Sequence, residues 1–364
     1  MSSLIPDSTL EWLLEPDNPP VRYLTLTDLL GRPPSDPEVR ETRSRLGQYG
    51  PTRTILEQFD QFRNDCKAEA YWKYTGMYWQ LIFLGQFRAD GQDPRVRELV
   101  QKMIETRNWV LIKRGGQCLT ANVLFALILL GYAEHPVVRE ATVGLAKRLL
   151  TDGGIDCEVM EYSLLPFCYM AQPKLLLCFG ADAGLRKQPS VAAAIQLLAR
   201  NLLAHQVFVY VPGNRNEWHK VLELKPSKAE LGGATVKSWM QKQKDQFLAE
   251  KGPGQPMEKP GWLKLGFPLH YNSDVLETLY ALALCRVPAD ESLQKPLQVL
   301  RQKMTPEGRW RLENSLNGKM RVDVEEVGKP SKWLTYRAWY ALKHFGVVKS
   351  QTKVTQAAQA RRSP

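Results

Sequence analysis

The sequence lacks any apolar run long enough to cross a membrane. Its longest run, "ANVLFALILLGY", covers Ala121 to Tyr132, whereas a spanning helix needs roughly 20 apolar residues. The first residues, "MSSLIPDSTLEW", contain no basic segment followed by an apolar one, so no secretory leader is expected. These absences predict a cytoplasmic protein without a transmembrane segment, and they leave open a peripheral contact with a membrane surface.

Cysteine is also scarce, with six residues spread over a chain of 364. This number and spread do not fit a disulfide scaffold, which leaves reduced thiols or a metal site as the alternatives. With 44% hydrophobic and 24% charged residues, the composition is far from that of a disordered chain. The chain is long enough for one large domain or two ordinary ones.

The net charge of +11 does not by itself indicate a nucleic-acid-binding protein. The tail at 347–364 holds four basic residues and no acid, and the region from about 205 to 262 holds nine basic residues against six acidic ones. The remainder therefore keeps a net charge of only +4. No nucleic-acid-binding motif accompanies it, so we expect no specific nucleic-acid partner and a disordered basic tail.

Two series of helical segments repeat along the chain. The first begins with similar openers, in which proline or an acid occupies the first helical turn, where both are favourable; they are "DPEVRE", "DPRVRE", "HPVVRE", "QPSVAA" and "DESLQK". The second series is more apolar and ends at a glycine or another small residue, namely Gly31, Gly85, Gly131, Gly180, Cys285 and Gly346. We expect these residues to terminate the helices, and the two series to form amphipathic outer and buried inner helices.

The spacing of the second series is near fifty residues, apart from one step of 105 that contains an insertion at about 205–262. Its glycine, proline and lysine content predicts a long loop or lid with one helix. A helical repeat of this period fits either an open solenoid or a closed ring. The predicted organisation is one helical domain over 1–346, interrupted by the insertion and followed by the tail.

The segment "QKMTPEGRW" fits the pattern Q-x5-G-x-W at Gln302, Gly308 and Trp310, and "DGGIDC" looks like a decayed copy. With the paired-helix period, the chain resembles the prenyltransferase and squalene-oxidase repeat proteins, that is, the terpenoid-cyclase-like superfamily, over roughly residues 10–346. The resemblance implies an all-α (α/α)6 toroid, in which six parallel inner helices lie inside six outer ones around a cavity at one mouth. The D-x-D-D and D-D-x-x-D motifs of terpenoid chemistry are absent.

In such a toroid, the residues that precede the inner helices face one rim. Asp156, Glu158 and Glu161 are candidate catalytic acids there, because acid-initiated cyclisation needs a buried carboxylic acid and aromatic walls that stabilise carbocations. Aromatic residues at helical spacing also fit simple core packing. The candidate substrate-binding residues are Trp72, Tyr74, Tyr78, Tyr162, His270, Tyr271, Lys332, Trp333 and Arg337.

A zinc site is the second hypothesis for this rim. Cys118, Cys157 and Cys168 precede two neighbouring inner helices, and His270 or Asp156 would complete a tetrahedral set of ligands that zinc prefers. Buried thiols without a metal are the alternative, because cysteine is common in apolar cores.

The resemblance, together with the absence of the two terpenoid motifs, leaves two functions open. One is a terpenoid cyclase-like or prenyltransferase-like enzyme that acts on an isoprenoid or another lipid-like substrate in the cavity. The other is a non-catalytic toroid that binds a peptide, a lipid or a protein partner, since fold alone does not fix activity.

Overall fold

The structure is a computed structural model, and it describes residues 5–65, 67–106, 116–155, 168–210, 226–252 and 254–346. Within these ranges the chain is predominantly helical, and the only strands are four short ones. The expected all-α class is therefore confirmed. None of the helices in the described ranges combines the length and the apolar character that crossing a membrane requires.

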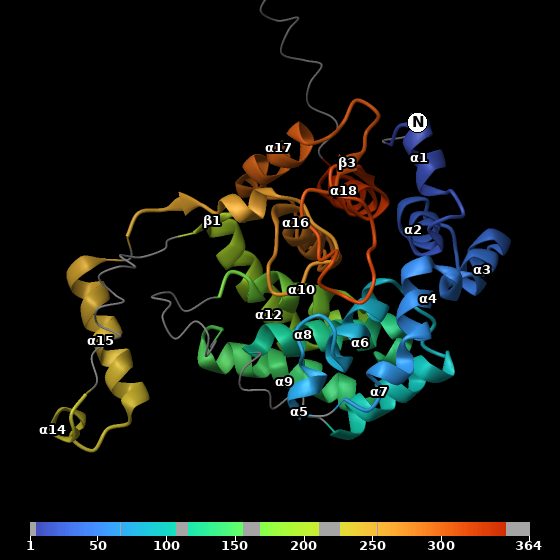
Figure 1. Cartoon of the computed structure of the whole chain (residues 1–364). Helices are drawn as coiled ribbons and strands as arrows, with labels where there is room; N and C mark the ends of the chain where they lie inside the picture. The colour runs from blue at the N-terminus through green and yellow to red at the C-terminus, as the bar shows by residue number, and fades with distance from the viewer. Residues whose placement is uncertain are drawn as a thin grey trace, which may run out of the picture.

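Six helices are largely buried, and we call them the inner helices; five of them are grouped in the middle of the molecule, and α2 lies to one side near α1 and α3 (Figure 1). Of these, α6, α8, α10, α16 and α18 contact one another in that order, and α18 also contacts α2. Every residue of α6 and α10 is buried, as the apolar series predicts. Their bounds are α2 (Pro19–Leu24), α6 (Met77–Gln86), α8 (Gly116–Leu127), α10 (Ala171–Gly180), α16 (Val275–Leu284) and α18 (Lys332–Phe345).

Amphipathic helices cover the inner ones from outside. In α7, the buried residues Val96, Leu99, Val100 and Met103 follow the helical period on one face. The five openers predict helix starts correctly, and in α3 the Asp36 side chain accepts hydrogen bonds from the first-turn amides. The outer helices are α3 (Pro37–Ser44), α7 (Pro94–Thr106), α9 (Pro136–Asp152), α12 (Pro189–Ala204) and α17 (Gln294–Gln302), which contact α2, α6, α8, α10 and α16, respectively.

Shorter helices and turns connect these pairs. Two of the inner helices, α2 and α8, continue into a single turn of π-helix, η1 and η5. The connecting elements are α1 (Asp7–Leu13), η1 (Thr25–Leu29), η2 (Leu46–Gln48), α4 (Gly50–Glu57), η3 (Phe59–Gln61), α5 (Lys67–Ala70), η5 (Ile128–Tyr132), α11 (Ala183–Arg186), η7 (Pro260–Leu263) and η8 (Glu291–Leu293).

The prediction that glycines end the inner helices is only partly correct. Gly346 closes α18 in the left-handed conformation, with φ of 67°. Gly85, however, lies inside α6, and the left-handed residue after that helix is Arg88, with φ of 57°. After α16, Arg286 adopts the same left-handed conformation. Gly85 is instead required for packing, because a Cβ there would lie 2.6 Å from Cα of Ala126 on α8.

Replacing Gly85 by alanine is therefore expected to lower the free energy of unfolding by about 1–3 kcal/mol, since α6 and α8 would have to move apart. Gly144 provides a matched control, because it lies within α9 and a Cβ there would meet nothing within 4 Å. Gly144→Ala should stabilise the protein by about 0.5–1 kcal/mol through helix propensity. Denaturant unfolding of both variants measures the difference, and equal effects would contradict the close approach.

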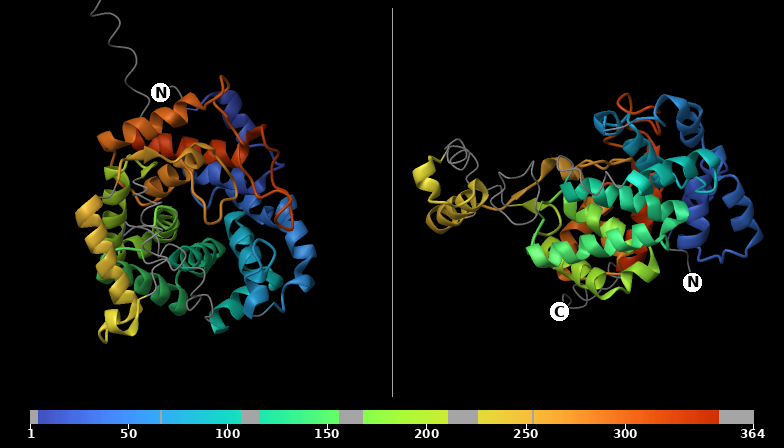
Figure 2. Two further views of the ribbon diagram at one scale, coloured as in Figure 1. Left: turned by 60° about the vertical axis from the view of Figure 1, so that its left-hand side comes forward. Right: turned by 90° about the horizontal axis from the view of Figure 1, so that it is seen from below.

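The predicted insertion leaves the helical body next to the point where it returns. Strand β1 (Val209–Tyr210) pairs antiparallel with β2 (Met257–Glu258). Between them, α14 (Lys228–Leu231) and α15 (Val236–Lys251) extend away from the helical body (Figures 1 and 2). The basic tail at 347–364 lies outside the described residues.

The Q-x5-G-x-W segment joins α17 to a small antiparallel ladder of β3 (Trp310–Arg311) and β4 (Pro330–Ser331). Trp310 is fully buried, and its indole Nε1 donates a 2.7 Å hydrogen bond to the carbonyl oxygen of Leu300 at the end of α17. Gly308 has φ of 81°, and a Cβ there would meet Pro6 at 2.9 Å. Gln302 is exposed, so only the second half of the motif supports the fold.

Candidate functional site

The three candidate catalytic acids, Asp156, Glu158 and Glu161, lie outside the described residues, together with Cys157 and Tyr162. Their proposed roles remain predictions. The other candidate residues are described, and they separate into different environments.

Three of the predicted substrate-binding residues meet near the start of α6. Tyr74, His270 and Tyr271 come together with Tyr71 and Trp79, and we call these five residues the aromatic cluster. The rings of Tyr74 and His270 lie 4.7 Å apart, and those of Trp79 and Tyr271 lie 5.3 Å apart. The hydroxyls of Tyr71 and Tyr271 share a hydrogen bond of 2.7 Å.

Burial shifts the pKa values of three residues of this cluster toward the uncharged form. It lowers the pKa of His270 to about 3, with nearby lysines adding to the effect. It also raises the pKa of Tyr74 to about 12 and raises that of Tyr271 further above its ordinary value. Nδ1 of His270 accepts a hydrogen bond from the Tyr271 amide, so the neutral ring carries its proton on Nε2.

The segment at 264–273, which carries His270 and Tyr271, packs between the inner helices. Phe267 and Leu269 are buried, and the Phe267 ring stacks on Trp333 with centroids 4.4 Å apart. Side-chain amides of Gln86 and Asn122 donate to the carbonyl oxygens of Leu269 and His270, respectively. This segment is therefore held in the core by both stacking and hydrogen bonds.

The remaining predicted residues do not share one environment. Trp72 is 60% exposed, whereas Tyr78 is 2% exposed within the core. Lys332 forms ion pairs with Glu15 at 2.7 Å and with Asp17. Trp333 and Arg337, one turn apart on α18, are the two predicted residues that line a pocket.

The described cysteines do not form a metal site on their own. Cys118 and Cys168 are both buried. Among the residues that the structure describes, no group of three or more His, Cys, Asp or Glu side chains is placed to hold a metal ion. The predicted zinc ligands include Cys157, and Asp156 is one of the two candidates for the fourth ligand; both lie outside these residues, so the zinc site remains a prediction.

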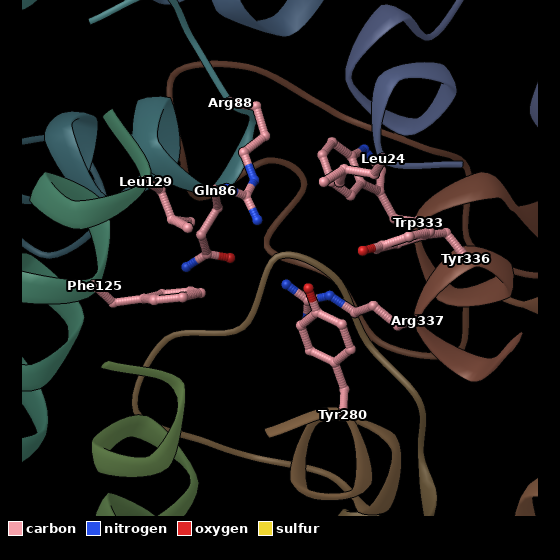
Figure 3. A pocket seen from close by; sticks show the side chains of 9 residues that line it. All are labelled: Leu24, Gln86, Arg88, Phe125, Leu129, Tyr280, Trp333, Tyr336 and Arg337. Carbon is pink, nitrogen blue, oxygen red and sulfur yellow. The ribbon is translucent and has the colours of Figure 1, made fainter. Parts of the chain in front are cut away.

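A pocket lies among five of the inner helices (Figure 3). It holds about 250 Å³ of space, its open side included. Most of this space is narrow or open to solvent, and the pocket has room for no more than about one water molecule. We call it the arginine pocket, because the side chains of Arg88 and Arg337 point into it from opposite sides. It is lined by Leu24, Gln86, Arg88, Phe125, Leu129, Tyr280, Trp333, Tyr336 and Arg337.

Polar atoms in this pocket lack partners within the protein. Arg337 is only 5% exposed, yet its Nη1 atom finds no acceptor among the described residues. Oε1 of Gln86 is likewise buried and without a donor in the described part of the chain. Tyr336, in contrast, donates a 2.5 Å hydrogen bond to Asp28. The pocket thus offers unsatisfied hydrogen-bonding groups between apolar and aromatic walls.

A buried ionic network lies between α10 and α16. Nζ of Lys174 lies 2.5 Å from Oε2 of Glu277, and both side chains are almost completely buried. The Ser273 hydroxyl donates to the same oxygen at 2.6 Å. Burial lowers the pKa of Lys174. Burial beside Glu277 raises that of Asp274, which caps α16, to about 7.

Sequence reasoning missed most of the pocket, including Gln86, Arg88 and Tyr280. A signal was present, because "LGQFRAD" places glutamine and arginine directly after an apolar helix. Comparison with protein-family models, with curated proteins and with solved structures gives no match for this chain.

Proposed function

We propose that this chain is an (α/α)6 toroid that binds an isoprenoid or another lipid-like ligand at the centre of its inner helices. The arginine pocket is the observation that carries the proposal, because five of the inner helices contribute to its lining. Leu24, Phe125, Leu129 and Trp333 give it apolar walls, which favour an apolar ligand. The contacts run from α6 through α8, α10, α16 and α18 to α2, an order that fits five of the six steps of such a ring.

The dimensions of the pocket indicate how such a ligand would lie. Since the pocket has room for no more than about one water molecule, an isoprenoid chain would extend toward the open side. Leu129 is the half-buried apolar lining residue that it would displace.

The pocket chemistry favours binding over cyclisation. No carboxylic acid is among the described residues that line it, and two guanidinium groups disfavour a developing carbocation beside them. An enzymatic function would depend on Asp156, Glu158 or Glu161. Incubation with farnesyl diphosphate, geranylgeranyl diphosphate and squalene, followed by acid-quench product analysis, tests it. A product that disappears in Asp156→Asn would favour the cyclase over the binding protein.

Calorimetric titration with farnesol tests the binding proposal. Leu129→Trp fills the pocket and should weaken farnesol binding about tenfold or more. Leu203→Trp is the matched control, because Leu203 is a half-buried leucine on the outer helix α12, and binding should be unchanged there. Absence of farnesol binding by the unmodified protein, or equal binding by Leu129→Trp, would contradict the proposal.

A further inference from the structure

We infer that the arginine pocket binds the carboxylate of a small organic acid between Arg88 and Arg337. That the rest of the acid is apolar follows from the proposed function. The binding of its carboxylate, in contrast, depends on Arg88 and Arg337. Their guanidinium groups approach the same space from different parts of the chain, Arg88 from the end of α6 and Arg337 from within α18 (Figure 3).

The environment of Arg337 calls for an anion. Its guanidinium carbon lies 4.7 Å from the centre of the Phe267 ring and 5.1 Å from that of Tyr280. These aromatic faces hold the cation but supply no hydrogen-bond acceptor in its plane. An Nη1 group taken out of water without an acceptor is unfavourable. Asp274 already gives Arg337 a nearby carboxyl group, whose burial-raised pKa the guanidinium lowers in part, so a carboxylate in the pocket would add the missing acceptor for Nη1.

Arg88 occupies a backbone position at which its side chain is not needed for the fold. The amide of Ala89 donates to the carbonyl oxygen of Leu84 at 3.0 Å, which closes the end of α6 with Arg88 left-handed. Glycine is the usual residue in this turn, because a side chain there is strained. Arg286 ends α16 in the same way, but it is exposed. Arg88 and Arg286 thus have the same backbone role, but only the Arg88 side chain reaches the pocket.

The shape of the site favours a carboxylate over a phosphate. A planar carboxylate fits the planar fork of a guanidinium through two parallel hydrogen bonds. Gln86 presents its unpartnered Oε1 to the pocket. There it can accept a hydrogen bond from Arg88 or from a donor on the ligand.

Calorimetric titration of the full-length protein with geranic acid and geraniol tests the inference, because the two differ only in the head group. Geranic acid should bind about tenfold more tightly or better, the effect expected of a charge-assisted hydrogen-bonded pair. Acetate and inorganic phosphate, titrated alone, probe the anion without an apolar chain. Acetate should compete with geranic acid, and phosphate should compete less well.

The variants separate recognition from folding. Arg337→Met and Arg88→Gly should each weaken geranic acid binding about tenfold or more, and each should change geraniol binding by a much smaller factor, because geraniol has no carboxylate. Arg286→Gly is the control with the same backbone change and should bind geranic acid normally. Arg337→Met is expected to melt at or above the temperature of the unmodified protein, because it removes a buried charge without an acceptor. Should Arg337→Met fail to fold, Arg88→Gly and Arg286→Gly still provide the comparison.

Equal affinity for geranic acid and geraniol, or unchanged geranic acid binding in Arg88→Gly, would overturn the inference and leave the proposed function intact. Tighter competition by phosphate than by acetate would also overturn it. Conversely, if acetate competes but the isoprenoid chain adds no affinity, the carboxylate site stands and the proposed lipid-like ligand fails.

Discussion

Replacing Lys174 by methionine is expected to lower the free energy of unfolding by about 3–5 kcal/mol, the range for breaking a buried ion pair on one side. The Lys174 and Glu277 side chains are 0% and 2% exposed, so the remaining carboxylate cannot be solvated by water. Ser273 would be left as its side-chain donor among the described residues. Denaturant unfolding measures the loss.

The double variant Lys174→Met/Glu277→Met gives the decisive comparison. Removing both charges leaves no unpaired ion, so most of the stability lost in the single variant should return. A loss below about 1 kcal/mol in Lys174→Met, the range of exposed pairs, would show that water reaches the site. A double variant no more stable than the single ones would show that packing around Lys174, rather than charge, determines the effect.

The helical repeat could be predicted from the sequence because it depends on local rules. Proline after Asp36 or His135 marks a helix start through the geometry of the first turn alone. The alternation of buried and amphipathic segments reflects the 3.6-residue period, which needs no knowledge of neighbours. Helix ends are harder to predict from local rules. Gly85 does not end its helix, and its small size is explained by the close approach to Ala126 on another helix.

The arginine pocket could not be predicted because its residues meet only through tertiary packing. The place of Arg337 in the chain predicts a position at a rim, but its surroundings come from Phe267 in a distant segment and from Tyr280 on α16. The sequence around Arg88 does not indicate a pocket, apart from the position of this arginine after an apolar run. Spacing predicts which residues share a helix face, not which faces enclose a space.

The buried network and the arginine pocket are adjacent parts of one polar interior. Arg337 influences the pKa values of both Lys174 and Asp274, so a charge that binds in the pocket would act on the network as well. Lys174 and Glu277 neutralise each other at 2.5 Å, whereas Arg337 faces the carboxyl group of Asp274, whose burial-raised pKa it lowers in part. An anion bound beside Arg337 would therefore weaken that effect and raise the pKa of Asp274 further.

Trp310→Ala is the second substitution with a large expected effect, a loss of about 3–5 kcal/mol in the free energy of unfolding. The indole is completely buried and lies edge-on to Trp339, with ring centroids 5.6 Å apart. Its removal leaves a cavity and deprives the Leu300 carbonyl of its donor. The last turn of α17 would then lose its attachment to α18, and denaturant unfolding measures the loss.

Two controls determine whether the whole Q-x5-G-x-W motif or only the tryptophan holds α17 in place. Trp310→Phe keeps most of the ring but not the hydrogen bond, so the loss should fall to about 1–3 kcal/mol. Gln302→Ala changes an exposed side chain and should alter stability by no more than about 0.5 kcal/mol. A loss of stability in Gln302→Ala comparable to that in Trp310→Ala would show that the glutamine also holds α17 in place. A small loss in both would mean that the packing of α17 against α16, rather than the motif, fixes its position.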